Sequence, residues 1–183
     1  MSAIIDPIDG TAMFSMHLPE WCVSVGIFRG YTPVYGFVYS PGFDMLFYND
    51  DSNAYLNGRP LKADRNISVD NETNIFSASE VSNRFIVDFP GKIRNLGSTA
   101  LHACLAADNA RNRTLAFIGK SNIWDWAGAV PGLKTVEMAE LAPLARHATY
   151  LRAHWQRRPP RLLVPHLFHK AFISRYQHAP KPA

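Results

Sequence analysis

The sequence predicts an α/β protein. Three observations predict this class. Residues 21–61 read as an antiparallel meander of β-branched and aromatic runs separated by turn residues. A helix that is small and apolar nearly all round follows Gly97, which implies that it is buried. Short strand-like runs stand on both sides of this helix, so sheet and helix are expected to pack on one another.

Length and composition are those of a soluble globular protein. Of the 183 residues, 47% are hydrophobic and 19% are charged, which suffices for one large domain or two small ones. The apolar runs are too short to span a bilayer, so no membrane partner is expected, and no signal peptide is evident. Cys22 and Cys104 are isolated and are predicted to be buried reduced thiols, which fits a cytoplasmic protein.

Charge is unevenly distributed along the chain. The net charge is +4, yet residues 141–183 contain 8 Lys and Arg and no acidic residue. A basic stretch of this kind can attract nucleic acid or another anionic polymer. Arg157, Arg158 and Arg161 lie around two prolines, without a nucleic-acid motif. We therefore expect a solvated, divergent tail and do not expect nucleic acid as a partner.

The segment from Ile4 to Thr11 is the first candidate site. An apolar run enters a turn that carries Asp6 and Asp9, and a helix is expected to begin near Thr11. The proline between the two carboxylates disfavours helix before it, and Gly10 tolerates backbone geometry that other residues resist. Two converging carboxylates suit Mg²⁺, and free N–H groups at a helix start suit a phosphate. A turn stabilised by an Asp side chain, without any ligand, is the alternative.

The meander that follows is expected to form a rigid antiparallel sheet. Its turns are marked by Pro41-Gly42, by residues 50–53 and by Asn57-Gly58, where a two-residue hairpin requires positive φ at both positions. The expected strands are residues 21–28, 34–39, 45–48 and 54–56.

Residues 64–73 are polar and are expected to connect two subdomains. Residues 1–73 would form the antiparallel-sheet subdomain with the metal site, and residues 74–183 an α/β subdomain with a divergent basic tail from about residue 141. Ser98 or Thr99 would cap the buried helix 100–108, and Asp125 stands at or near the start of another helix, where an N-cap is its alternative role. The expected strands are residues 74–79, 85–89, 93–96 and 115–118.

The tail is harder to interpret. Residues 136–155 are rich in helix formers, residues 162–164 suggest a strand, and residues 167–176 suggest a closing helix. His166 and His169 have the spacing of a metal pair on a helix, but no third ligand is apparent. We interpret both histidines as structural.

Four motifs occur along the chain in a fixed order. They are Asp6-Pro7-Ile8-Asp9-Gly10-Thr11, Val23-Ser24-Val25-Gly26, Asn95-Leu96-Gly97-Ser98-Thr99-Ala100 and Ile123-Trp124-Asp125. With these motifs the chain resembles the inositol monophosphatase family of Mg²⁺-dependent sugar phosphatases over about residues 3–130. The resemblance implies a sugar-phosphatase-like fold of alternating helix and sheet layers, with the usual N-terminal region missing.

The resemblance also implies roles for individual residues. The groups that would hold Mg²⁺ are the Asp6, Asp9 and Asp125 carboxylates and the Ile8 carbonyl. The groups that would bind phosphate are the Gly10 and Thr11 N–H groups, and the Thr11 hydroxyl would orient the attacking water. The segment that would approach the hydroxylated ring of the substrate is Gly97, Ser98 and Thr99.

Three departures from the family pattern leave two functions open. A segment of the Gly-Glu-Glu type, which helps to activate water, is absent; Ile118 replaces an acidic substrate ligand; and residues 136–140 replace a Glu-Ala-Gly-Gly type segment. The expected function is Mg²⁺-dependent hydrolysis of an inositol phosphate or related sugar phosphate. The alternative is a weak or inactive remnant that binds metal, phosphate or a partner chain. A missing N-terminal region would expose apolar faces, which favours self-association, as in a homo-oligomer, or poor solubility.

Overall fold

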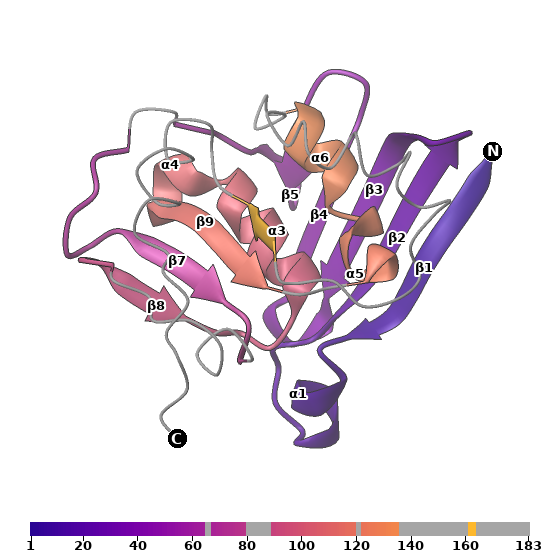
Figure 1. The fold of residues 1–183 in the computed structure, drawn as a ribbon. Helices are drawn as coiled ribbons and strands as arrows, with labels where there is room; N and C mark the ends of the chain where they lie inside the picture. Colours follow the sequence, from indigo (N-terminus) through magenta and orange to yellow (C-terminus); the bar gives the residue numbers. More distant parts are fainter. Residues whose placement is uncertain (65–66, 80–88, 120–121, 136–160, 164–183) are drawn as a thin grey trace.

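A computed structural model of the chain describes residues 1–64, 67–79, 89–119, 122–135 and 161–163. Two sheets face each other across a layer of helices (Figure 1). The predicted class of alternating helix and sheet layers is confirmed. Within the described part of the chain, none of the helices has the length and apolar character needed to cross a membrane.

The first sheet is the predicted antiparallel meander, preceded by one more strand. Its strands run in sequence order, and every neighbouring pair is antiparallel. Asn57 and Gly58 have φ of 48° and 80°, as the hairpin prediction requires. The strands are β1 (Ser2–Asp9), β2 (Cys22–Arg29), β3 (Thr32–Ser40), β4 (Met45–Asn49), β5 (Ala54–Leu56) and β6 (Arg59–Pro60).

Two short helical segments accompany this sheet. Helix α1 (Thr11–Ser15) begins where the sequence predicted a helix, directly after β1. The turn predicted at Pro41-Gly42 is a 3-10 turn, η1 (Pro41–Phe43), between β3 and β4. Both segments lie at strand ends, so they redirect the chain without covering a sheet face.

The second sheet is mixed. Strands β7 (Asn74–Ser77), β8 (Lys92–Arg94) and β9 (Thr114–Gly119) are parallel, and β10 (Arg161–Leu163) is antiparallel to β9. The boundaries of these strands lie within two residues of the predicted runs. The predicted strand at 85–89 includes residues that lie outside the described part, as do the elements predicted at 136–155 and 167–176 and the two tail histidines.

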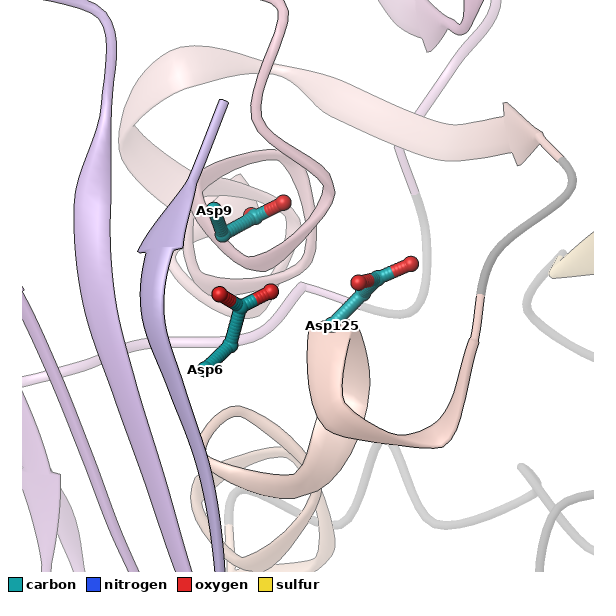
Figure 2. A group of neighbouring side chains, drawn as sticks. All are labelled: Asp6, Asp9 and Asp125. Atoms are coloured by element: carbon teal, nitrogen blue, oxygen red, sulfur yellow. The ribbon is translucent and has the colours of Figure 1, made fainter. Parts of the chain in front are cut away.

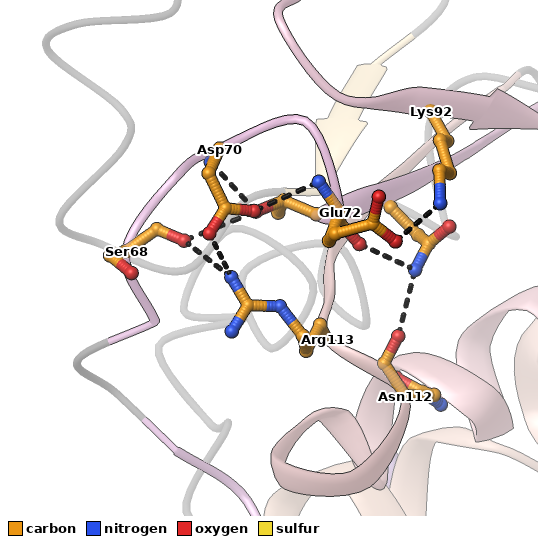
Figure 3. A network of polar contacts seen from close by, with 8 residues as sticks. Ser68, Asp70, Glu72, Lys92, Asn112 and Arg113 are labelled. Carbon is orange, nitrogen blue, oxygen red and sulfur yellow. Dashed lines mark hydrogen bonds and ion pairs between the residues drawn. The ribbon is translucent and has the colours of Figure 1, made fainter.

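Polar contacts connect the chain segments at the end of this second sheet where β7, β8 and β9 begin (Figure 3). The Arg113 guanidinium donates to the Asp70 carboxylate at 2.6 Å and to the Ser68 carbonyl at 3.3 Å. Lys92 pairs with Glu72 at the same end. These contacts tie the connecting loop to β8 and β9 at solvent-exposed positions, where an ion pair contributes little to stability.

Helices α3, α5 and α6 form the layer between the sheets (Figure 1). Helix α3 (Thr99–Ala107) is buried on nearly every side, as predicted, and Ser98 is its N-cap, accepting the Leu101 N–H at 3.2 Å. Helix α5 (Ile123–Ala127) packs on β1 and β2, and α6 (Val130–Thr135) packs on β3. A short helix, α4 (Asn109–Asn112), follows α3 and was not predicted.

Two glycines in the first sheet let this helical layer come close. A Cβ at Gly26 would overlap the Ala127 carbonyl, and a Cβ at Gly36 would overlap the Gly128 carbonyl. Glycine inside a strand often marks such an approach of another backbone segment. The break between α5 and α6 lies at Gly128–Ala129, and Pro131 sits in the first turn of α6, where its missing N–H costs little.

Candidate metal centre

A bulge at the end of β1 brings Asp6 and Asp9 to the same face of the sheet. Residues three apart on a regular strand point to opposite faces. Here Asp6 pairs with Ser24 and Asp9 pairs with Cys22, so three residues of β1 span two residues of β2. Ser24 and Cys22 lie two apart and are both fully buried on the helical side of the sheet. The two carboxylates therefore both face the helical layer.

Asp125 completes a cluster of three carboxylates (Figure 2). Its helix, α5, packs on β1 and β2 and brings it opposite the bulge. One carboxylate oxygen from each of Asp6, Asp9 and Asp125 lies within 4.8 Å of the others. Asp9 is 7% exposed, and the other two are half-buried. The convergence across the chain that the family resemblance implied is present in the structure.

The local structure around Asp125 differs from a simple N-cap. Asn122 is the N-cap of α5, and Asp125 is the third helical residue, which completes a capping box by accepting the Asn122 N–H at 2.6 Å. Asp125 is therefore not the N-cap residue of α5, although its carboxylate takes part in capping that helix. Burial raises the pKa of Asp125 to about 7, and the neighbouring Asp9 and Asp6 carboxylates add to this rise in pKa.

Asp9 is held by groups that also begin helix α3. Its Oδ2 accepts the Ser98 hydroxyl at 2.6 Å and the Ala100 N–H at 2.7 Å. Burial raises the pKa of Asp9 and outweighs these hydrogen bonds, which lower it; the Asp6 charge raises it further. The carboxylate is thus desolvated and repelled by a like charge, but its direction is fixed by two strong donors.

The turn between β1 and α1 has the predicted backbone. Gly10 has φ of +92°, and a Cβ there would lie 2.9 Å from the Glu20 carbonyl oxygen, so the position requires glycine. Thr11 is exposed and begins α1 beside the carboxylates. Ile8 lies in the bulge, where its N–H donates to the Asp6 carboxylate at 3.0 Å. The ligand roles predicted for the Ile8 carbonyl and for Gly10 and Thr11 remain predictions.

The three residues predicted to face the substrate ring lie in different environments. Gly97 is exposed with φ of +74°, and a Cβ there would collide with the Met13 side chain of α1. Thr99 is half-buried, whereas Ser98 is completely buried and directs its hydroxyl to Asp9. Only Gly97 and Thr99 therefore retain any exposed surface for a substrate.

Sequence reasoning did not assign a role to two buried residues of β2 behind the carboxylates. The Ser24 hydroxyl donates to the Trp124 carbonyl at 3.4 Å and accepts the Gly128 N–H at 3.2 Å, so it touches both ends of α5. The Cys22 thiol lies 3.3 Å from the Ser98 hydroxyl. Cys22 and Cys104 are free and buried, as predicted. The available signal was the alternation in β2, which puts small polar residues at inward positions.

The donor set fits a hard divalent cation. Three carboxylates offer oxygen ligands, and such ligands are those preferred by Mg²⁺ and similar ions. Their proximity in a partly buried site is unfavourable without a counter-charge, which agrees with the raised pKa of Asp9 and of Asp125. A cation would remove this repulsion. The cluster is therefore able to bind a metal ion.

Comparisons with known proteins agree with this geometry. Residues 1–134 match the family model of the inositol monophosphatase family. Inositol monophosphatase 1 of Solanum lycopersicum is 35% identical over an alignment of 137 residues, which covers 68% of this chain and 50% of that protein. The fructose-1,6-bisphosphatase/inositol-1-monophosphatase of Aquifex aeolicus is 30% identical over 141 residues, covering 71% of this chain and 53% of that protein.

A solved structure gives the same result. The crystal structure of inositol monophosphatase-II from Staphylococcus aureus MSSA476 superposes with a TM-score of 0.60 and 26% identity, over 74% of this chain and 55% of that one. The chain spans about half the length of the curated relatives it matches. Since the family model covers most of the sequence and the carboxylates of its first and last motifs meet in one cluster, the chain belongs to the inositol monophosphatase family.

Proposed function

We propose that this protein hydrolyses a phosphomonoester, an inositol phosphate or a related sugar phosphate, in a Mg²⁺-dependent reaction. The observation that carries the proposal is the meeting of Asp6, Asp9 and Asp125 within 4.8 Å. The names of the relatives support the substrate class, because they include inositol monophosphatases and fructose-1,6-bisphosphatases. The related Staphylococcus aureus enzyme has been crystallised with inositol monophosphate and with 2'-AMP, both phosphate esters on a hydroxylated ring.

The proposed mechanism uses the chain's own groups to bind and orient. Bound Mg²⁺ would neutralise phosphoryl charge and lower the pKa of water. Asp6, Asp9 and Asp125 hold the cation, together with the Ile8 carbonyl. The Gly10 and Thr11 N–H groups bind phosphate oxygens, and the Thr11 hydroxyl orients the water that attacks phosphorus. The alcohol leaves as the P–O bond breaks, without a covalent enzyme intermediate.

A second candidate function is binding of metal and phosphate with little or no turnover, and the composition of the cluster favours it. Among the described residues, the cluster contains three aspartates and no glutamate. The family resemblance implies a further Glu-bearing segment that helps to activate the water. Losing a catalytic acid or base typically lowers a rate by about 10²–10⁴-fold. A chain with this cluster alone would bind metal and phosphate, or a partner chain, with weak turnover or none.

Phosphate release separates the two candidates. Sugar and inositol phosphates would be tested with and without Mg²⁺, and we expect Asp9→Asn to lower the metal-dependent rate at least about 10²-fold. Asp51→Asn is the matched control, because Asp51 is exposed and accepts the Tyr35 hydroxyl far along the chain from the cluster. Full activity in Asp9→Asn would exclude the proposed site, and a folded wild-type protein without turnover would favour the second function.

A further inference from the structure

A buried layer of hydrogen-bonding groups lies behind the carboxylate cluster. It consists of Cys22 and Ser24 on β2 and Ser98 at the start of α3, each with 0% of its surface exposed. No solvent reaches these groups, so the contacts that they make must satisfy them. Their hydrogen bonds lead to Asp9 and to the helix that carries Asp125. This arrangement suggests that the layer serves the carboxylates.

The direction of each bond around Ser98 follows from its chemistry. A hydroxyl has one proton, and at 2.6 Å from Oδ2 that proton is donated to the Asp9 carboxylate. The same oxygen accepts the Leu101 N–H at 3.2 Å. The Cys22 thiol keeps its proton because burial raises its pKa; it lies 3.3 Å from the Ser98 oxygen and donates to Asp9 Oδ2 at 3.9 Å. The Ser98 hydroxyl therefore makes all its contacts within the protein, and none of its lone pairs faces solvent.

The start of helix α3 adds to the hold on Asp9. The Ala100 N–H is one of the first N–H groups of the helix, which have no partner within it, and it donates to Oδ2 at 2.7 Å. Oδ2 thus receives the Ser98 hydroxyl and the Ala100 N–H together. Two short bonds to one oxygen fix the plane of the carboxylate before any ligand arrives.

Ser24 has the corresponding relation to Asp125, but through the backbone. It accepts the Gly128 N–H just after α5 and donates to the Trp124 carbonyl, the residue before Asp125. Ser24 is also the cross-strand partner of Asp6. One hydroxyl therefore links the strand position of one carboxylate to the helix that carries another.

We propose that Ser98 and Ser24 are positioning residues that set the cation affinity of the cluster, and that Ser98 does not contact the substrate. The inference rests on the proposed metal role of Asp6, Asp9 and Asp125. It replaces the substrate-binding role implied for Ser98 by the family resemblance, because a completely buried hydroxyl cannot reach a sugar ring. Removing an outer partner of a metal ligand typically weakens metal binding about 10- to 100-fold.

The test measures Mn²⁺ binding to the full-length protein by electron paramagnetic resonance, in the absence of substrate. We expect Ser98→Ala to raise the Mn²⁺ dissociation constant about 10- to 100-fold and Ser24→Ala to raise it about tenfold. Ser40→Ala is the matched control, because Ser40 is equally buried in the same sheet but donates to the Trp21 carbonyl. It loses the same kind of bond and should bind Mn²⁺ like the wild type.

A second variant guards against misfolding. Ser98→Gly also removes the hydroxyl, but glycine is nearly as good an N-cap, so helix α3 should still form. At saturating Mg²⁺ the KM for the phosphate ester should be unchanged in the Ser98 variants, whereas loss of a substrate contact would raise it. Folding of every variant is checked by circular dichroism.

The outcomes are distinct. Weaker Mn²⁺ binding in the Ser98 and Ser24 variants, with the Ser40 control unchanged, supports the inference even if the protein shows no turnover. Unchanged Mn²⁺ binding in Ser98→Gly, or a raised KM for the ester alone, overturns it. A wild-type protein that binds no Mn²⁺, or an Asp9→Asn variant that binds it normally, overturns the metal assignment and this inference with it.

Discussion

The two faces of the first sheet are built from the same strands but meet different surroundings. On the helical side, Cys22, Ser24, Val38 and Phe47 are at most 3% exposed. On the opposite side, four large side chains are 37% to 56% exposed, namely Ile5, Phe37, Tyr39 and Leu46. Successive residues of a strand point to opposite faces, so each strand contributes to both environments. The inner face mixes apolar, small and polar residues, all buried, whereas the outer face exposes large apolar side chains.

The inner face is covered by packed helices, whereas the outer face is not covered by any described element. The inner face has room for backbone at Gly26 and Gly36 and hydrogen bonds for every carboxylate of the cluster. The outer face joins neighbouring apolar positions of β1 to β5, and within the described residues no helix or strand packs on it. Exposed apolar patches of this kind mark association surfaces. The self-association predicted from the sequence is therefore to be tested on the outer face.

The largest effect is expected from adding one methyl group to the inner face. Gly36→Ala would place a Cβ against the Gly128 carbonyl, and backbone on both sides cannot move aside as a flexible side chain would. We expect the free energy of unfolding to fall by about 3 kcal/mol or more, at the upper end for overpacking. Urea unfolding followed by circular dichroism measures this change.

Gly132→Ala is the control on the same layer. It lies in α6, and a Cβ there would meet the Ala54 Cβ at 3.5 Å, an ordinary contact. Alanine is the better helix former, so this variant should be unchanged or more stable by up to about 1 kcal/mol. Equal stability of the two variants would show that the close approach of α6 to β3 is not required.

These glycines also show what the sequence could and could not predict. Alternation and turn residues predicted the meander, and the hydroxyl residues Ser98 and Thr99, either of which could cap a helix, predicted the start of α3. The reason for glycine at 26 and 36 lies in α5 and α6, about a hundred residues later in the chain. No local pattern reports such an approach, because it arises only when the layers pack.

The candidate site divides in the same way. The identities of Asp6, Asp9 and Asp125 came from motifs, and the positive φ of Gly10 came from its place in a turn. The bulge that turns Asp6 and Asp9 to one face depends on the register with β2. The burial of Ser98 and its bond to Asp9 depend on contact between segments that are far apart in the sequence. The parallel pairing of β7 with β8 and β9 was likewise not predicted, since strand order depends on contacts between distant segments.

The second prediction concerns the protonation of a buried histidine in the helical layer. His102 of α3 is 2% exposed, stacks on Phe76 and accepts the Leu96 N–H through Nε2 at 2.8 Å. Burial lowers the pKa of His102 to about 4, below its value of about 6.5 in the unfolded chain. Folding favours the neutral form of His102. Its contribution to the free energy of unfolding is therefore fully present above pH 6.5 and is lost as the pH falls toward 4.

This linkage should lower the free energy of unfolding by about 2 kcal/mol between pH 7 and pH 5. His102→Gln keeps an acceptor for the Leu96 N–H but cannot take up a proton, so it isolates the histidine from the carboxylates that titrate nearby. The measured quantity is the difference between the two proteins in urea unfolding at each pH. Parallel pH dependence in both proteins would show that His102 is not the group responsible.

The smallest effect on stability is expected on the outer face, where the consequence should appear in association instead. Phe37 is 42% exposed, so Phe37→Lys should change the free energy of unfolding by about 0.5 kcal/mol or less. A charge in the middle of an apolar interface would have to be desolvated without a partner, which opposes association strongly. Light scattering should therefore show a shift toward monomer.

Phe43→Lys is the control. Phe43 is 43% exposed but lies in η1, outside the strands, so this variant should leave the oligomer unchanged. An equal shift in both variants would attribute association to general apolar exposure, and a monomeric wild-type protein would show that the outer face does not bind a second copy.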